Sequence, residues 1–123
     1  MTTGPEAAAG KKVLVAEDEY FIAKGLVRHL AQAGAEVVGP VPTVADGMAA
    51  LERGAIDAAV LDVNLRGDPV YPVADALLDR GVPFVFVTGY GSGMIPERYA
   101  AVECFEKPVE PEAFVRILFG PRA

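Results

Sequence analysis

Hydrophobic and polar residues follow two alternating patterns along this chain, and these patterns predict strands and helices in turn. Short unbroken apolar runs, typical of strands buried on both faces, are each followed by a stretch in which apolar residues recur at helical spacing. The predicted strands cover residues 13–16, 36–41, 58–61, 83–88 and 102–105. The predicted helices begin near Tyr20, Thr43, Pro72, Pro96 and Pro111, and the one after Pro96 is expected to be short.

Residues with strong positional preferences mark the ends of these elements. Thr43 is expected to be an N-cap and Pro72 the first residue of a helix, and a glycine follows the end of each of the first three helices. Pro40 has no backbone N–H, which places the second strand at an edge of the sheet. The apolar helix residues expected to face the sheet are Ala23, Leu26, Val27, Leu30, Val44, Met48, Leu51, Val73, Leu77, Leu78, Phe114, Ile117 and Leu118.

The alternation of strands and helices indicates a parallel sheet that is covered by helices on both faces. Because crossover connections are right-handed, five such strands favour the flavodoxin-like (βα)5 fold, an α/β doubly wound parallel sheet with strand order 2-1-3-4-5. The 123 residues suffice for one domain with a sizeable core. We expect residues 1–10 to be a flexible leader and residues 11–120 to form the domain.

Composition and charge exclude several functional classes. Apolar residues make up 52% of the chain and charged residues 23%, as in an ordinary globular protein. The net charge of −6 argues against binding to nucleic acid or to an anionic membrane surface. No apolar run approaches the roughly 20 residues of a membrane-spanning helix. The single cysteine, Cys104, offers no disulfide framework and suits a reducing compartment, so we expect a cytoplasmic protein.

Polar side chains lie at the ends of four predicted strands. Glu17 and Asp18 follow the first strand, Asp62 follows the third, Thr88 ends the fourth and Lys107 follows the fifth. In the predicted strand order these strands are neighbours, and the carboxyl ends of parallel strands open on the same edge of a sheet. Each residue alone is more often an ordinary turn or capping residue. Together they predict a site with three carboxylates, one hydroxyl and one ammonium group.

This set of side chains indicates phosphoryl chemistry. Carboxylates this close repel one another unless a cation neutralises them, and ligands that are all oxygen favour Mg²⁺, or alternatively Mn²⁺, over zinc. The metal ion and Lys107 would then place two positive charges beside a carboxylate, which is an arrangement that binds a phosphoryl group. Carboxylates accept phosphoryl groups as acyl phosphates, so Asp62 is the predicted nucleophile.

Nearly the whole chain, from residue 12 to residue 119, resembles the receiver domain of two-component response regulators. The matching residues are the acidic pair Glu17-Asp18, Asp62 in VLDVNL, Thr88 in FVTGY and Lys107 in EKP. The FVTGY segment, together with the NLRGD stretch, is similar to the FAT GUY subgroup of receivers. As a set these motifs are specific, because every one lies at the carboxyl end of the expected strand.

The resemblance implies that Asp62 accepts a phosphoryl group from the phosphohistidine of a sensor histidine kinase or a phosphotransfer protein. It also implies that Mg²⁺ is held by Asp18, Asp62 and the main-chain carbonyl of Asn64, with Glu17 acting through a water molecule. A receiver is a signalling domain rather than an enzyme in the usual sense. Its implied partners are the phosphodonor, a downstream protein that the sequence does not identify and, through the face of the fourth helix and fifth strand, a second copy of the chain.

Three further expectations follow from the same resemblance. Thr88 and Lys107 would bind the phosphoryl oxygens, and the Lys107–Pro108 peptide bond would be cis. Many receivers carry an aromatic residue where this chain has Cys104, and Phe105 cannot replace it because neighbouring strand residues point to opposite faces. We therefore expect the phosphoryl signal to leave through the glycine-rich segment that contains Tyr90.

Two alternative functions stay open at this point. A flavodoxin-like module that binds a cofactor would need a loop of Gly, Ser and Thr after the first strand to hold a phosphate, and this chain has Glu-Asp-Glu there. A degenerate receiver would act as an interaction or dimerisation module without phosphorylation. Titration with Mg²⁺ separates these alternatives, because a cofactor module ignores the metal ion and a degenerate receiver binds it weakly.

Overall fold

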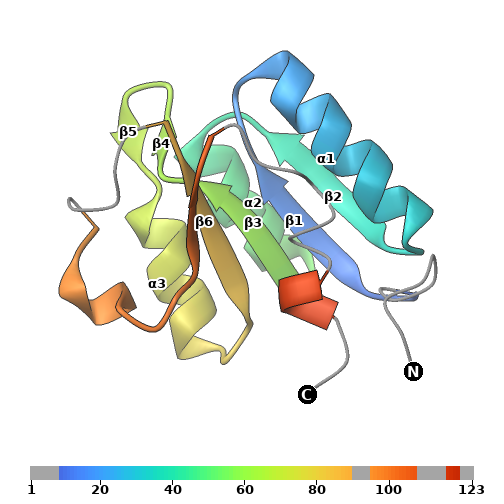
Figure 1. Ribbon diagram of the computed structural model, residues 1–123. Coiled ribbons are helices and arrows are strands. Elements are labelled where there is room, and N and C mark those ends of the chain that lie inside the picture. Colours follow the sequence, from blue (N-terminus) through green and yellow to red (C-terminus); the bar gives the residue numbers. More distant parts are fainter. Residues whose placement is uncertain (1–8, 90–94, 108–115, 120–123) are drawn as a thin grey trace.

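The computed structural model describes residues 9–89, 95–107 and 116–119. At its centre is a parallel sheet of five strands in the order β2-β1-β3-β6-β7 (Figure 1). These strands are β1 (Lys12–Ala16), β2 (Glu36–Val41), β3 (Ala58–Asp62), β6 (Phe84–Thr88) and β7 (Cys104–Glu106). When only the strands of this sheet are counted along the chain, the order is 2-1-3-4-5, so the predicted flavodoxin-like fold is confirmed.

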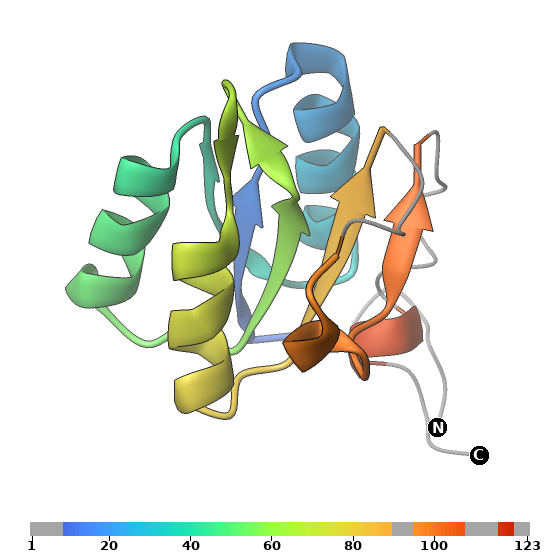
Figure 2. The same cartoon turned by 90° about the vertical axis from the view of Figure 1, so that its left-hand side faces the viewer.

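Helices cover both faces of the sheet (Figure 2). α1 (Tyr20–Gln32) packs on one face, together with the helical turn at residues 116–119. α2 (Val44–Arg53) and α3 (Tyr71–Asp79) pack on the other face. A short 3₁₀ turn, η2 (Glu97–Tyr99), stands where a short fourth helix was predicted. No helix in the described part of the chain is long and apolar enough to cross a membrane.

The middle of the sheet is buried on both faces, as the unbroken apolar runs predicted. All residues of β3, from Ala58 to Asp62, are buried, and so are the last four of β1. Because β3 pairs in parallel with both β1 and β6, the carboxyl ends of the three strands reach the same edge of the sheet. β2 is an edge strand, as Pro40 predicted, and its Gly39–Pro40 peptide bond is cis. This scaffold places Asp62 at the edge where the first and third strands end.

The strand content differs from the prediction in two stretches. β7 begins at Cys104 rather than at residue 102, because the Val102 N–H is donated to the Tyr99 carbonyl in the turn after η2. The stretch after β3, predicted as a turn, contains an antiparallel hairpin of β4 (Asn64–Leu65) and β5 (Asp68–Pro69). The hairpin stands beside the carboxyl edge of the sheet (Figure 1).

Two helix positions that were predicted to face the sheet are exposed instead. Leu78 is 41% exposed. The buried face of α3 is formed by Val73, Ala74 and Leu77, which share one side of the helix, and Leu78 lies beyond its edge. Ile117 is 47% exposed, while the two residues after it pack against the sheet. Both residues were assigned to the inner face from their apolar character and spacing alone.

Several predicted features lie outside the described residues. These are the main part of the leader, Tyr90, Phe114 and the Lys107–Pro108 peptide bond, which involves residue 108. Cys104 and Phe105, which were predicted to face opposite ways, lie within the described residues. Cys104 packs with the cluster beneath α2 and α3, and Phe105 packs with the cluster beneath α1, so this prediction is confirmed.

A tyrosine from η2 is inserted into the core between the sheet and α3. Tyr99 is 1% exposed, and its ring lies 5.2 Å from that of Phe86, 5.4 Å from that of Tyr71 and 6.4 Å from that of Phe84. Its hydroxyl donates a hydrogen bond to the Asp75 carboxylate on α3. The segment after residue 95 is therefore fastened to α3 by a buried aromatic side chain, which the sequence pattern did not predict.

Candidate functional site

Four of the predicted site residues meet at the carboxyl edge of the sheet. Glu17 and Asp18 directly follow β1, and Asp62 ends β3. Each of the three offers a carboxylate oxygen, and these oxygens lie within 4.8 Å of one another. Lys107 follows β7, and its Nζ donates hydrogen bonds to Asp62 Oδ2 at 2.9 Å and to Glu17 Oε2 at 3.1 Å. The fold thus brings together side chains that are up to 90 residues apart in the chain.

The other two predicted residues border this cluster. Thr88 is buried at the end of β6, and its main-chain carbonyl accepts the Lys107 N–H at 2.8 Å, which fixes the backbone that carries the lysine. Asn64, in the hairpin, donates its backbone N–H to Asp62 Oδ1 at 3.1 Å. Its own side chain accepts the Gly67 N–H at 2.8 Å. One oxygen of Asp62 is thereby held by the hairpin, and the other faces Lys107.

A tight turn in the hairpin holds Asp18. Asp18 Oδ2 accepts the backbone N–H of Arg66 at 3.0 Å. Arg66 has a φ of 53° and Gly67 a φ of 90°, so the turn lies in the left-handed region that non-glycine residues seldom adopt. This conformation turns the Arg66 N–H toward the first strand. The hairpin and the loop after β1 are therefore linked across the site.

Burial makes the negative charge of Glu17 costly. Glu17 is 3% exposed, and its Oε1 has no hydrogen-bond partner among the described residues. Burial raises the pKa of Glu17 to about 7, and the nearby Asp62 carboxylate adds to the rise, although the hydrogen bond from the Glu19 N–H opposes it. A buried carboxylate with an unpaired oxygen is stabilised by a cation at hand. Glu17 thus points to a positive charge in addition to that of Lys107.

Lys107 alone does not balance the negative charge of the site. Burial by itself lowers the pKa of the ammonium, but hydrogen bonds to Asp62 and Glu19 outweigh it, so the pKa lies above its usual value and the group is a cation at neutral pH. One positive charge then faces the carboxylates of Glu17, Asp18 and Asp62. Carboxylate oxygens are the ligands that Mg²⁺ takes in proteins. The donor set therefore fits a divalent cation.

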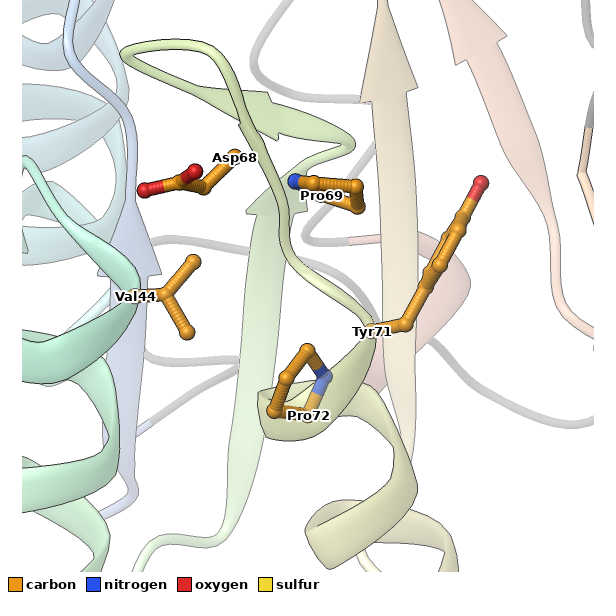
Figure 3. Close-up of a pocket in the computed structure, with 5 residues that line it drawn as sticks. All are labelled: Val44, Asp68, Pro69, Tyr71 and Pro72. Carbon is orange, nitrogen blue, oxygen red and sulfur yellow. The ribbon is translucent and has the colours of Figure 1, made fainter.

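An open apolar pocket of about 480 Å³ lies next to this site, between the start of α2, the hairpin and the start of α3 (Figure 3). Its walls are formed by Val44, Asp68, Pro69, Tyr71 and Pro72. Binding sites for small molecules combine apolar walls with several convergent polar groups. Asp68 is the charged residue among those that line the pocket, and in Figure 3 the Tyr71 hydroxyl points away from the others. The pocket therefore contributes no cation to the cluster.

One contact of the site was missed from the sequence. Glu19 Oε1 accepts a hydrogen bond from Lys107 Nζ at 3.0 Å. Glu19 is the last residue of the Glu-Asp-Glu run, so its identity gave a signal, but only Glu17 and Asp18 of this run were assigned to the site. The contact depends on how the Lys107 side chain extends from the end of β7 across the carboxyl edge of the sheet, which only the tertiary structure reveals.

We predict that Asp18 contributes more to metal affinity than Glu17. Asp18 is expected to bind the ion directly and Glu17 through water, because Mg²⁺ gives up its own water molecules reluctantly. Loss of a group that acts through water typically costs about tenfold in metal affinity. Glu17→Ala should weaken Mg²⁺ binding by roughly that factor, and Asp18→Ala should weaken it further, in a titration followed by NMR. Asp79 is an exposed carboxylate on α3, and the control variant Asp79→Ala should bind Mg²⁺ like the wild type. The reverse order for the two site variants would show that their roles are exchanged.

Comparison with known proteins identifies the family. No protein-family model matches the chain. The solved structure of SdrG from Sphingomonas melonis Fr1 is 40% identical, with a TM-score of 0.77, and the match covers 91% of this chain and 93% of SdrG. The BeF3-activated conformation of SdrG is 43% identical over 82% of this chain and 86% of that one, with a TM-score of 0.67.

Two further likenesses agree with this match. The transcriptional regulatory protein PdtaR of Mycobacterium tuberculosis is 32% identical over 101 residues, which is 79% of this chain and 48% of PdtaR. The chain thus spans about half the length of the curated relatives it matches. The receiver domain of the response regulator TorR is 24% identical over 87% of this chain and 92% of its own, with a TM-score of 0.70, and shares the fold. With its sheet order, its acidic cluster and its likeness to SdrG, this chain belongs to the receiver domains of response regulators.

Proposed function

We propose that this receiver domain accepts a phosphoryl group on Asp62, with Mg²⁺ bound, from the phosphohistidine of a sensor histidine kinase or a phosphotransfer protein. The observation that carries the proposal is the placement of the Asp62 carboxylate. Its Oδ2 lies 2.9 Å from Lys107 Nζ, in a cluster with two further carboxylates that fits a cation. A nucleophilic oxygen beside two positive charges is what phosphoryl transfer requires.

The residues of the chain account for the transfer step. An oxygen of Asp62 forms a bond to phosphorus as the bond from phosphorus to the imidazole nitrogen of the donor breaks, and the imidazole leaves with the electron pair of that bond and takes up a proton. The Asn64 N–H holds Asp62 Oδ1 and so orients the carboxylate. Lys107 is then available to bind a phosphoryl oxygen.

When bound, a divalent metal ion would neutralise negative charge on the carboxylates and on the phosphoryl oxygens. Asp18, Asp62 and the main-chain carbonyl of Asn64 are its proposed ligands, with Glu17 acting through water. The buried, unpaired Oε1 of Glu17 supports a cation at this place. Asp18 is held in position by the Arg66 N–H at 3.0 Å, which would keep its carboxylate directed at the site.

Phosphorylation is proposed to change the binding of a downstream protein. Thr88 would bind a phosphoryl oxygen, and its carbonyl is hydrogen-bonded to the Lys107 N–H, so both phosphoryl-binding residues belong to one hydrogen-bonded unit at the ends of β6 and β7. We place the output surface, and with it any homodimer contact, at η2 and β7.

The likeness to SdrG supports assignment to the FAT GUY subgroup of receivers. We also propose that residues 11–120 form the domain.

Intact mass spectrometry tests the proposal. Incubation with acetyl phosphate and Mg²⁺ should add one phosphoryl group to each chain, and the addition should be absent when EDTA removes the metal ion. Binding of Mg²⁺ without any phosphoryl addition, from acetyl phosphate or from purified kinases, would instead support a degenerate receiver that acts without phosphorylation. Loss of the label in mild alkali would agree with an acyl phosphate, which hydrolyses far more readily than a phosphoserine.

A further inference from the structure

All three hydrogens of the Lys107 ammonium are directed at carboxylates. An ammonium group has three N–H donors. Lys107 Nζ lies 2.9 Å from Asp62 Oδ2, 3.0 Å from Glu19 Oε1 and 3.1 Å from Glu17 Oε2. A phosphoryl oxygen that binds this ammonium must therefore replace one of the three carboxylates.

The three carboxylates are not held equally firmly. The side chains of Glu17 and Asp62 are 1% and 7% exposed, whereas that of Glu19 is 59% exposed. Glu17 Oε2 also accepts the Glu19 N–H at 3.0 Å, and Asp62 Oδ1 accepts the Asn64 N–H at 3.1 Å, so both are anchored by the backbone. An exposed ion pair is weak because water screens it. Glu19 is thus the partner that leaves Lys107 most easily.

The position of Glu19 in the chain offers its carboxylate a second location. Glu19 is the N-cap residue of α1, and its carbonyl accepts the Ala23 N–H at 2.9 Å, but its side chain makes no capping hydrogen bond. The first N–H groups of a helix have no partner within the helix and favour nearby negative charge. A carboxylate released by Lys107 can therefore turn to the N-terminus of α1.

We propose that Glu19 is a built-in competitor of the phosphoryl group. Its carboxylate occupies the Lys107 ammonium in the free protein and moves to the start of α1 when a phosphoryl group arrives. The inference rests on the proposed function, because it needs Lys107 to bind the phosphoryl group. Glu19 is here a positioning residue. It sets how readily the ammonium becomes available and so lowers the affinity of the site for a phosphoryl group.

Beryllofluoride tests this competition, because it imitates a phosphoryl group on an aspartate without covalent transfer. The wild type, Glu19→Gln and Glu19→Asp are titrated with beryllofluoride at saturating Mg²⁺. Glu19→Asp keeps the charge but is one methylene shorter, so it separates the contact with Lys107 from the net charge. Both variants should bind about two- to fivefold more tightly than the wild type, since they lose one exposed ion pair. Glu36→Gln, an exposed carboxylate at the start of β2, should bind like the wild type.

NMR adds a readout that does not depend on affinity. In the wild type, beryllofluoride should shift the backbone amide signals of Phe21 and Ile22 in the first turn of α1, and this shift should shrink in Glu19→Gln. The competitor role is overturned if Glu19→Asp binds like the wild type while Glu19→Gln binds more tightly, because net charge would then explain the effect. Equal or weaker binding by both variants overturns it as well. If the wild type itself binds no beryllofluoride with Mg²⁺, the proposed function fails first and the inference with it.

Discussion

Replacing Asp62 by Asn should reduce phosphorylation by acetyl phosphate to background. The amide of Asn has no negatively charged oxygen, so it cannot form the acyl phosphate. Its shape is almost that of Asp, and its carbonyl oxygen can still accept the Asn64 N–H that holds Asp62 Oδ1 at 3.1 Å. The fold should therefore persist while the phosphoryl transfer is lost. Intact mass spectrometry after incubation with the phosphodonor and Mg²⁺ measures the result.

Asp68→Asn is the matched control for this variant. Asp68 lies in β5 of the neighbouring hairpin and is exposed, and it belongs to the pocket beside the site rather than to the acidic cluster. The control removes the same charge from the same part of the molecule and should be phosphorylated like the wild type. Labelling that survives unchanged in Asp62→Asn, with its circular dichroism spectrum intact, would show that another side chain is the acceptor.

Replacing Tyr99 by Ala should produce a large loss of stability, although Tyr99 lies outside the site. Truncation of a fully buried aromatic residue costs about 3–5 kcal/mol, because apolar contacts are lost and a cavity stays behind. Tyr99 is 1% exposed and lies against the rings of Tyr71, Phe84 and Phe86. Unfolding in urea, followed by circular dichroism, gives the free energy directly.

Tyr99→Phe separates the packing of the ring from the hydrogen bonds of its hydroxyl. The hydroxyl is bonded to the Asp75 carboxylate and lies 3.3 Å from the Tyr71 carbonyl, while Arg98 binds the same Asp75 carboxylate at 2.9 Å. Burial, and then the bond to Asp75, raise the pKa of Tyr99 to about 12, so the hydroxyl stays a donor. Loss of this donor should cost about 1 kcal/mol. Equal stability losses in the Phe and Ala variants would contradict a role for ring packing.

The sheet was predictable because its pattern is local. A strand buried on both faces must be apolar throughout, and β3 is an unbroken run that ends in Asp62. Once the strands are recognised, the handedness of their connections leaves few orders, and the order places the strand-end residues on one edge. This is why the sequence alone predicts Glu17, Asp18 and Lys107 near Asp62.

The features that escaped prediction depend on tertiary contacts. Tyr99 belongs to a short 3₁₀ turn with no helical period, and its burial arises because the large ring fills the space between α3 and the sheet. The contact of Glu19 with Lys107 depends on the reach of the Lys107 side chain across the carboxyl edge of the sheet. Leu78 is apolar but lies beyond the buried face of its helix. In a short helix with apolar residues at adjacent positions, the sequence does not define where the buried face ends.

The identity of the phosphorylated residue is the central claim, and chemical trapping measures it most directly. Borohydride reduces an acyl phosphate to an alcohol, so a phosphorylated aspartate becomes homoserine and stays marked through proteolysis. After incubation with acetyl phosphate and Mg²⁺, trapping, digestion and tandem mass spectrometry should place homoserine at position 62, and no such product should form with EDTA present. Homoserine at position 18, or a wild-type protein that is phosphorylated with position 62 still aspartate, would contradict the account.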